Sequence, residues 1–408
     1  KTLCGTDASL VETMETCMEF LEAPPLPFYF TPDHEQFRAS VRDFVAREIT
    51  PFVNEWDEAE TFPRALYGRA AEIGIQGLGY PEEYGGTPAD IFYQLVVAEE
   101  FARCGGGGVQ ASMNSHSIAL PPILNAGSDA IKRRVIPSVL RGEKIAALAV
   151  TEPSGGSDVA NLRTTAVLDG DHYVVNGEKT FITSGMRADF ITTAVRTNPA
   201  IKGSGGISVL VIDGDTPGLT RTSLKKMGWW SSDTAHLRFD NCRVPVANLV
   251  GDENRGFKTF MQNFNSERLF MSALACGYAE VCLQEAVDWT RQRTLAGTAL
   301  SERQVVRHKL MDMTLRIDAA RSLIYDLAYR IEHKLARPAQ LVARVCLAKV
   351  QATQAMQFCA DQAVQLLGGM GYMRGTRSER IYREVKVMMI GGGSEEVMKD
   401  LAARQLGV

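Results

Sequence analysis

One carboxylate interrupts an apolar stripe on a helix that the sequence predicts between about residues 256 and 291. The stripe repeats at steps of four and three, and its members are Phe260, Phe264, Met271, Leu274, Tyr278 and Val281. Glu267 completes the series. A buried carboxylate without a partner is costly or has its pKa raised, and a raised pKa suits a general base. The pattern therefore allows an ion pair with Arg268, a drift of the helix boundary, or a catalytic base at Glu267.

A second polar cluster lies where predicted helices give way to predicted strands. Residues 150–158 read Val-Thr-Glu-Pro-Ser-Gly-Gly-Ser-Asp. Glycine lets a backbone approach a planar or phosphorylated ligand closely, and the hydroxyls of Thr151 and Ser157 can form hydrogen bonds to ring heteroatoms or phosphates. A solvated turn between two domains would have the same composition. The segment alone therefore indicates either a ligand-binding loop or a simple turn.

Several other chemical motifs do not occur in the sequence. The four glycines at 105–108 neither follow a clear strand nor form the GxGxxG pattern of a dinucleotide fold. The eight cysteines include no CxxC pair, and the six histidines form no HExxH. We therefore expect no metal site, and we expect reduced thiols in an intracellular compartment.

Three regions of different periodicity must position these residues. Thr31 is a predicted N-cap, Pro32 suits a first turn, and several short helices then continue to about residue 141. Alternating hydrophobicity replaces the helical pattern between 146 and 250, and helical spacing returns after Gly256. We expect a mainly α protein with a central β domain. Its parts are an N-terminal extension (1–30), an N-terminal α domain (31–145), a middle antiparallel β sandwich or barrel (146–250) and a C-terminal α bundle (251–408).

Individual elements follow from the same patterns. Strands are predicted at 165–168, 173–176, 179–183, 191–195, 207–212 and 237–239, with hairpin turns at Asp169-Gly170 and Asn176-Gly177. An apolar seam from 306 to 331 predicts one long helix. Pro338 opens a further helix, which Gly368-Gly369 close.

The charge balance narrows the range of partners. The 408 residues include 44 basic and 48 acidic side chains, a net charge of −4. Nucleic acid is not an expected partner, because its phosphates require a basic face. No apolar run approaches about 18 residues, so we expect no membrane span. Residues 1–27 show neither the basic nor the apolar segment of a signal peptide. Small molecules or proteins are the expected partners.

Three separated segments together resemble the acyl-CoA dehydrogenase family. They are Val150-Thr151-Glu152-Pro153 with Gly156-Ser157-Asp158, residues 176–183 (Asn-Gly-Glu-Lys-Thr-Phe-Ile-Thr) and residues 365–372 (Gln-Leu-Leu-Gly-Gly-Met-Gly-Tyr), in the family's order and spacing. The resemblance extends over residues 30–408. It implies an N-terminal α domain, a middle β domain, a C-terminal four-helix bundle, one FAD per subunit and a homotetramer.

The resemblance assigns cofactor-binding residues in two groups. Around the isoalloxazine and the phosphates it places Val150, Thr151, Gly156, Ser157, Phe181 and Thr183, with Phe181 covering the flavin and Thr183 near its N5. At the adenosine end it places Arg293, Gln365 and Gly369 of an adjacent subunit, with Ser394 and Glu396 closing over the dinucleotide. This sequence departs from the family at 293–297, which lacks an aromatic residue, and at Gly375, where relatives have an acid.

The catalytic base differs between branches of the family. In most branches it is a glutamate near the C-terminus, where this sequence has Gly392. A branch that resembles long-chain and isovaleryl-CoA dehydrogenases takes the base from a helix that reads Glu-Arg-Leu, and this sequence has Glu267-Arg268-Leu269. The apolar stripe and the resemblance therefore indicate the same residue.

The implied reaction is the α,β-dehydrogenation of an acyl-CoA to a trans-2-enoyl-CoA. Glu267 would remove the α-proton while the β-hydrogen leaves as hydride to the flavin, whose electrons would pass to an electron-transfer flavoprotein. Ser157, Arg268, Gly391 and Gly392 would lie beside the substrate, where the glycines would leave room for a long or branched acyl group. A flavin oxidase or monooxygenase on the same fold and a non-catalytic acyl-CoA-binding relative are the alternatives.

Three further points stay open at this level. Trp229 and Trp230 either narrow the mouth of the site or pack at the edge of the β domain. The acyl group is not indicated. The compartment is either bacterial cytoplasm or mitochondrial matrix.

Overall fold

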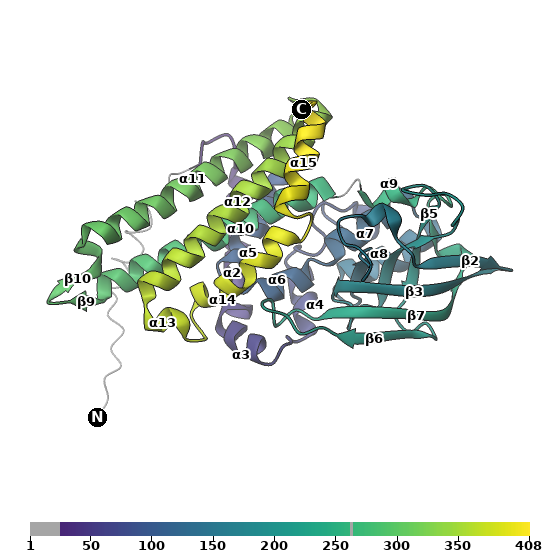
Figure 1. The fold of residues 1–408 in the computed structure, drawn as a ribbon, viewed down its shortest axis with the longest axis horizontal. Helices are drawn as coiled ribbons and strands as arrows, with labels where there is room; N and C mark the ends of the chain where they lie inside the picture. Colours follow the sequence, from purple (N-terminus) through teal and green to yellow (C-terminus); the bar gives the residue numbers. More distant parts are fainter. Residues whose placement is uncertain (1–24, 262–263) are drawn as a thin grey trace.

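The computed structural model describes residues 25–261 and 264–408 (Figure 1). Its N-terminal part consists of short helices: α2 (Pro32–Glu48), α3 (Val53–Glu58), α4 (Ala65–Glu72), α5 (Ile91–Ala102), α6 (Gly107–Met113), α7 (His116–Ala126) and α8 (Asp129–Leu140). Thr31 caps α2 as predicted, because its hydroxyl accepts a hydrogen bond from the His34 N–H while its own N–H donates to His34 Nδ1. Phe44 of α2 packs near Phe101 of α5 in the core of this domain.

The middle domain is one sheet of eight strands. They are β1 (Ala146–Ala149), β2 (Thr165–Asp169), β3 (His172–Thr183), β4 (Phe190–Arg196), β5 (Ile207–Asp213), β6 (Leu219–Ser223), β7 (Thr234–Pro245) and β8 (Leu249–Val250). The order is β6-β7-β3-β2-β4-β5-β8, with β1 beside β4. Most pairings are antiparallel, as predicted, whereas β1 and β2 both pair with β4 in parallel. Helix α7 packs against β1 and β4, and the Thr192 hydroxyl donates to the carbonyl of Ala119 across this contact.

One of the two predicted hairpin turns is wrong. Asp169-Gly170 does connect β2 to β3, and Gly170 has a φ of +62°. Asn176-Gly177 instead lies inside β3, where the pairing with β7 shifts register between Val175 and Gly177. A Cβ on Gly177 would lie 2.6 Å from Thr164 Cα, so this glycine permits a bulge and a close backbone approach. The two short strands that the sequence predicted here are therefore one long strand.

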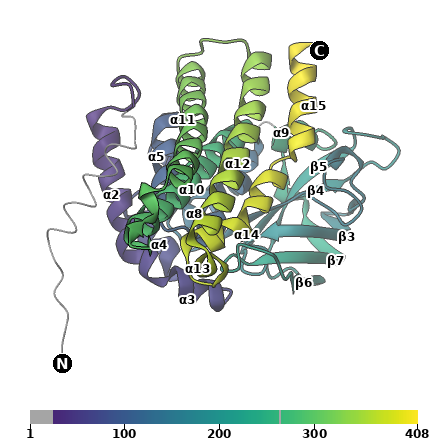
Figure 2. The ribbon, with the colours of Figure 1, turned by 60° about the vertical axis from the view of Figure 1, so that its left-hand side comes forward.

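The C-terminal part is a bundle of long helices (Figures 1 and 2). It comprises α9 (Gly256–Met261), α10 (Phe264–Gln292), α11 (Gln304–Glu332), α12 (Pro338–Leu367), α13 (Gly369–Tyr372), α14 (Arg377–Ile390) and α15 (Glu395–Leu406), with the small hairpin of β9 (Thr294–Leu295) and β10 (Thr298–Ala299) after α10. The predicted seam of α11 is confirmed, since seven of its eight positions from Val306 to Leu327 are buried and Ile331 packs partly buried against the same core. Gly368, with a φ of +62°, ends α12 as predicted.

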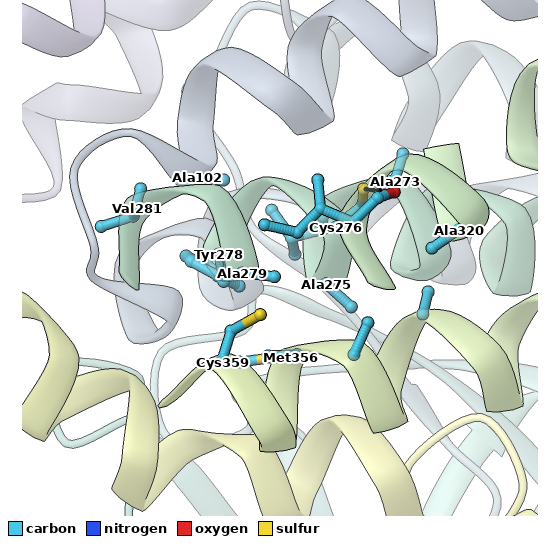
Figure 3. Packing of buried hydrophobic residues seen from close by; sticks show 14 of the residues in the cluster. Ala102, Ala273, Ala275, Cys276, Tyr278, Ala279, Val281, Ala320, Met356 and Cys359 are labelled. Atoms are coloured by element: carbon cyan, nitrogen blue, oxygen red, sulfur yellow. Dashed lines mark hydrogen bonds between the residues drawn. The ribbon is translucent and has the colours of Figure 1, made fainter. Parts of the chain in front are cut away.

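Small side chains let α10 and α12 pack closely. Figure 3 shows Ala275 and Ala279 of α10 facing Met356 and Cys359 of α12, and all four are buried. Tyr278 of α10 is fully buried in the same cluster. Burial of such side chains, at about 25 cal/mol per Å² of apolar surface, stabilises the packing of α10, which carries Glu267, against α12.

Most of the expected N-terminal extension (1–30) lies outside the described residues, as do Cys4 and Cys17. Tyr29 packs 5.5 Å from Tyr325 of α11, measured between ring centroids. The other six cysteines are buried free thiols. Within the described ranges, no helix is long and apolar enough to span a membrane, and no three His, Cys, Asp or Glu side chains are grouped to hold a metal ion.

Candidate active site

Glu267 lies in the first turn of α10. The residue as a whole is partly exposed, but its Oε2 is buried and has no hydrogen-bond partner among the described residues. Burial raises the pKa of this carboxyl to about 7, although the positive charges of Arg268 and Lys349 oppose the rise. The predicted apolar stripe is confirmed in part, because Phe260 of α9 and Met271 and Leu274 of α10 are buried.

Arg268 is buried but does not form an ion pair with its neighbour Glu267. Its Nε donates to the carbonyl of Gly392 at 3.0 Å, and its Nη1 lies 3.3 Å from Asn265 Oδ1. Its guanidinium also lies 5.7 Å from the ring centroid of Phe264. The arrangement therefore gives no support to the ion-pair explanation of Glu267.

A glycine loop, Gly391–Gly393, faces this part of α10. Gly392 and Gly393 have φ values of +66° and +114°. A Cβ on Gly392 would lie 3.0 Å from Met271 Sδ, and one on Gly393 would lie 2.3 Å from Met398 Cε. Side chains of the protein therefore lie where a Cβ would point at those two positions, and the expectation that these glycines leave room for the acyl group stays a prediction. The glycines serve the backbone turn.

Lys349 of α12 is a member of the site that sequence reasoning missed. It is buried, and its Nζ donates to the carbonyls of Gly391 and Gly393, each at 2.6 Å. Burial lowers its pKa to about 8. Its position among the buried residues Val345, Cys346 and Ala352 of α12 was the available signal, since a lysine on an apolar helix face is as unusual as a glutamate.

The loop at 150–158 is shaped by a buried ion pair. Glu152 Oε1 and Lys179 Nζ are 2.9 Å apart, and Lys179 also donates to the carbonyl of Val150. The two oxygens of Glu152 accept the backbone N–H groups of Arg163 and Thr164. Burial would raise the pKa of Glu152, but Lys179 and these backbone donors hold it below its usual value. The loop is therefore held in one conformation at its base.

The predicted flavin residues of β3 lie beside this loop. The N–H of Thr180 donates to the carbonyl of Thr151 at 2.9 Å. Phe181 has a φ of +60° at a second bulge of β3 and is 69% exposed. Left-handed backbone in a bulky residue is strained, and such strain is concentrated at functional positions. Thr183 is partly buried two residues further on, whereas Gly156 and Ser157 are exposed at the tip of the loop.

The loop and the glutamate helix share one core. Val150 belongs to the same buried cluster as Phe260 of α9, and Phe264 of α10 packs against that cluster. Ser394 follows the glycine loop and caps α15, accepting the N–H of Val397. Glu396, in the first turn of α15, is exposed, and its pKa is lowered by backbone and Ser394 hydrogen bonds. The loop at 150–158 and the first turn of α10 therefore pack against the same cluster.

Arg293, Gln365 and Gly369 lie elsewhere. All three are exposed, near the ends of α10 and α12 that adjoin the β9–β10 hairpin and α13. Figure 1 shows that end of the bundle opposite the sheet. A single chain does not bring these three residues together with the loop at 150–158.

The two tryptophans pack at a junction between domains. The guanidinium groups of Arg374 and Arg383 lie 4.2 and 3.8 Å from the centroid of the Trp230 ring, and Trp230 Nε1 donates to the Lys226 carbonyl. The N–H of Trp229 donates to Glu384 of α14. These contacts favour a packing role over a role at the mouth of the site.

Comparison with known proteins agrees with this geometry. The sequence matches the N-terminal, middle and C-terminal domains of acyl-CoA dehydrogenase over residues 31–143, 147–242 and 254–407. The probable acyl-CoA dehydrogenase YngJ of Bacillus subtilis is 35% identical over 93% of this chain and 99% of its own length.

Solved structures give the same result. A putative acyl-CoA dehydrogenase from Mycobacterium smegmatis superposes with a TM-score of 0.89 at 46% identity, over 93% of this chain and 99% of that one. A glutaryl-CoA dehydrogenase from the same species, in complex with FADH2, superposes with a TM-score of 0.86 at 25% identity, over 93% and 95%. Because all three domains match in order over nearly the whole described chain, the protein belongs to the acyl-CoA dehydrogenase family of oxidoreductases.

Proposed function

We propose that this acyl-CoA dehydrogenase carries out FAD-dependent α,β-dehydrogenation of an acyl-CoA thioester with Glu267 as the base. The observation that supports this most directly is the buried Oε2 of Glu267, which has no hydrogen-bond partner within the described ranges. A buried carboxylate without a hydrogen-bond partner lowers the stability of the folded protein. Such groups with raised pKa values are concentrated at catalytic sites. A pKa of about 7 lets it be ionised and still bind a proton strongly near neutral pH.

The residues of the 150–158 loop and β3 fit a flavin. Phe181 presents an exposed aromatic ring from strained backbone next to Thr151, whose carbonyl is already bound by the Thr180 N–H. Thr151 and Thr183 would hold the ring edge, Phe181 would cover the ring, and Gly156 and Ser157 would meet a phosphate or the acyl-CoA. Bound FAD would accept the β-hydrogen of the substrate as hydride.

The protein's own part in the reaction is proton removal. Glu267 Oε2 would take the α-proton of the thioester, and the electron pair of that C–H bond would form the new double bond as the β-hydride leaves. Exclusion of water from the buried oxygen increases its basicity. Arg268, Gly391 and Gly392 would form the neighbouring wall of the acyl site. The products are a trans-2-enoyl-CoA and reduced cofactor.

The branch and the assembly belong to the same proposal. Gly392 stands where most branches have their base, and Glu267-Arg268-Leu269 matches the branch that resembles long-chain and isovaleryl-CoA dehydrogenases. Arg293, Gln365 and Gly369 are exposed and lie far from the flavin loop, which supports their contact with the adenosine of a neighbouring subunit's FAD in a homotetramer. Ser394 and Glu396 would close over the dinucleotide. An electron-transfer flavoprotein would then accept the electrons.

The reaction class can be tested with the purified flavoprotein. We expect anaerobic bleaching of the flavin by a subset of acyl-CoAs that differ in length and branching, with slow reoxidation by oxygen and fast reoxidation by an electron-transfer flavoprotein. Rapid peroxide formation in air would identify an oxidase instead. A protein that binds acyl-CoA without any bleaching would be a non-catalytic relative and would contradict the proposal.

A further inference from the structure

Lys349 is a buried cation that has no carboxylate partner within ion-pair distance among the described residues. It is 1% exposed, and its ammonium lies 2.6 Å from the carbonyls of Gly391 and Gly393 and 3.4 Å from that of Met389. An ammonium has three N–H donors, so backbone carbonyls satisfy all of them. A buried charge that is solvated by peptide dipoles alone needs a fixed loop around it.

The glycine loop is bound from two helices at once. Lys349 of α12 donates hydrogen bonds to the carbonyls of Gly391 and Gly393. Arg268 of α10 donates a hydrogen bond to the carbonyl of Gly392, which lies between them in sequence. Three consecutive carbonyls therefore point at two cations. Both Gly392 and Gly393 adopt positive φ values that L side chains rarely adopt, which this alternating arrangement requires.

The same two cations act on Glu267. Arg268 follows Glu267 in the sequence, and Lys349 binds the carbonyls on either side of the one that Arg268 binds, so both positive charges lie near this carboxyl and oppose the rise of its pKa. The thiol of Cys346, also on α12, lies near both cations. The glycine loop contributes backbone only. Arg268 and Lys349 favour the carboxylate form of Glu267, whereas burial favours the protonated form.

We propose that Lys349 is a positioning residue of this site, which fixes the Gly391–Gly393 loop through its carbonyls and keeps Glu267 ionised through its charge. The inference rests on the proposed function only where turnover is concerned. Removal of the ammonium would leave the carbonyls of the loop unpaired and would take one of two cations away from the carboxylate. Glu267 would then hold its proton at a higher pH, and less of the enzyme would carry a competent base at neutral pH.

The first test measures the protonation of Glu267 without substrate. In the full-length holoprotein, difference infrared spectroscopy would follow the C=O band of the protonated carboxyl, assigned by its loss in Glu267→Gln. In Lys349→Gln the midpoint should rise by about one pH unit, a tenfold gain in proton affinity. Thr353→Ala is the matched control, because this buried hydroxyl on the same helix donates to the Lys349 carbonyl at 2.9 Å. Its midpoint should not move.

An unchanged midpoint in Lys349→Gln would overturn the proposal. Because the titration needs no turnover, it separates this inference from the proposed reaction. If no acyl-CoA bleaches the wild-type flavin, the proposed function fails, while the infrared midpoints still decide the role of Lys349.

The second test uses Lys349→Arg, which keeps the cation but alters the geometry of its donors. We expect this variant to fold even if Lys349→Gln does not, and to titrate like the wild type. Its flavin reduction should nevertheless be slower by about tenfold across the pH range, because the loop is held differently. A midpoint that rises in Lys349→Arg as far as in Lys349→Gln, or wild-type reduction rates with every acyl-CoA, would contradict the proposal.

Discussion

Arg268 turns away from its neighbour Glu267 and binds the backbone of another segment. Its Nε donates to the Gly392 carbonyl at 3.0 Å, which leaves Glu267 Oε2 buried and without a hydrogen bond from any described residue. The arginine thus supports the glutamate by charge and the glycine loop by hydrogen bonding. A direct ion pair would have lowered the pKa of the carboxyl and weakened it as a base.

The pH dependence of flavin reduction should follow from this arrangement. Glu267 must be ionised to accept a proton, and its pKa is raised to about 7. The rate constant for anaerobic reduction by a saturating acyl-CoA should therefore fall as the pH drops below about 7, by about tenfold per unit well below the midpoint. Stopped-flow measurements between pH 5.5 and 8.5 would show this. A rate that is independent of pH in that range would count against Glu267 as the base.

Glu267 should also lower the stability of the fold at high pH. Its folded pKa of about 7 exceeds an unfolded value of about 4.3, so the native state binds more protons in this window and unfolding becomes easier as pH rises through it. The cost at pH 8 is on the order of 3–4 kcal/mol. Glu267→Gln lacks this titration.

Urea unfolding of the wild type and of Glu267→Gln at pH 5 and pH 8 would measure the effect. The variant should gain stability relative to the wild type at the higher pH. Parallel pH profiles for the two proteins would show that the carboxyl is not desolvated in the folded state.

The buried ion pair of Glu152 and Lys179 should be essential for the conformation of the loop at 150–158. Lys179→Met leaves a buried carboxylate without its cation, which costs about 3–5 kcal/mol. Lys225→Met is the matched control, because its ion pair with Glu60 is exposed and is worth less than about 1 kcal/mol. Urea midpoints and flavin content would report both changes. Equal stability and equal flavin content in the two variants would refute the role of the buried pair.

Gly392→Ala should impair the site more than a comparable change elsewhere. The new Cβ would meet Met271 Sδ at 3.0 Å and would strain a backbone with a φ of +66°. Gly170→Ala provides the control, since Gly170 has a φ of +62° in the β2–β3 turn with nothing within 4 Å of its Cβ. Both should lose about 1 kcal/mol from backbone strain. Only Gly392→Ala should slow flavin reduction, and equal reduction rates would show that the loop tolerates movement.

Much of the fold could be predicted because its signals are local. The cap at Thr31, the seam of α11 and the end of α12 at Gly368 each depend on a few neighbouring residues. The Asn176-Gly177 turn was wrong because a glycine between two strand-like runs reads equally as a turn or as a bulge. Contact with Thr164, which lies on another segment, decides for the bulge.

In the candidate site, too, local signals could be predicted, whereas contacts between distant segments could not. Glu267 could be found because a carboxylate interrupts an apolar stripe, and that signal lies within one helix. The direction of the Arg268 side chain could not be predicted, because its partner, the Gly392 carbonyl, is 124 positions away in sequence. Lys349 was missed because its role depends on carbonyls of a loop rather than on side chains. Only the folded packing shows that Met271 and Met398 lie where a Cβ on Gly392 and on Gly393 would point.

The most direct test of Glu267 as the base compares two glutamates whose pKa values are both raised by burial of the carboxyl group. Glu384 of α14 accepts the Gly107 N–H at 2.9 Å and lies at a domain junction, and burial raises its pKa to about 8. Glu267→Gln and Glu384→Gln should both fold and bind flavin. In single-turnover anaerobic reduction by the best acyl-CoA, Glu384→Gln should stay within about threefold of the wild type, while Glu267→Gln should lose at least about a thousandfold, as expected when the base is removed. If Glu267→Gln kept even a tenth of the wild-type rate, Glu267 would not be the base.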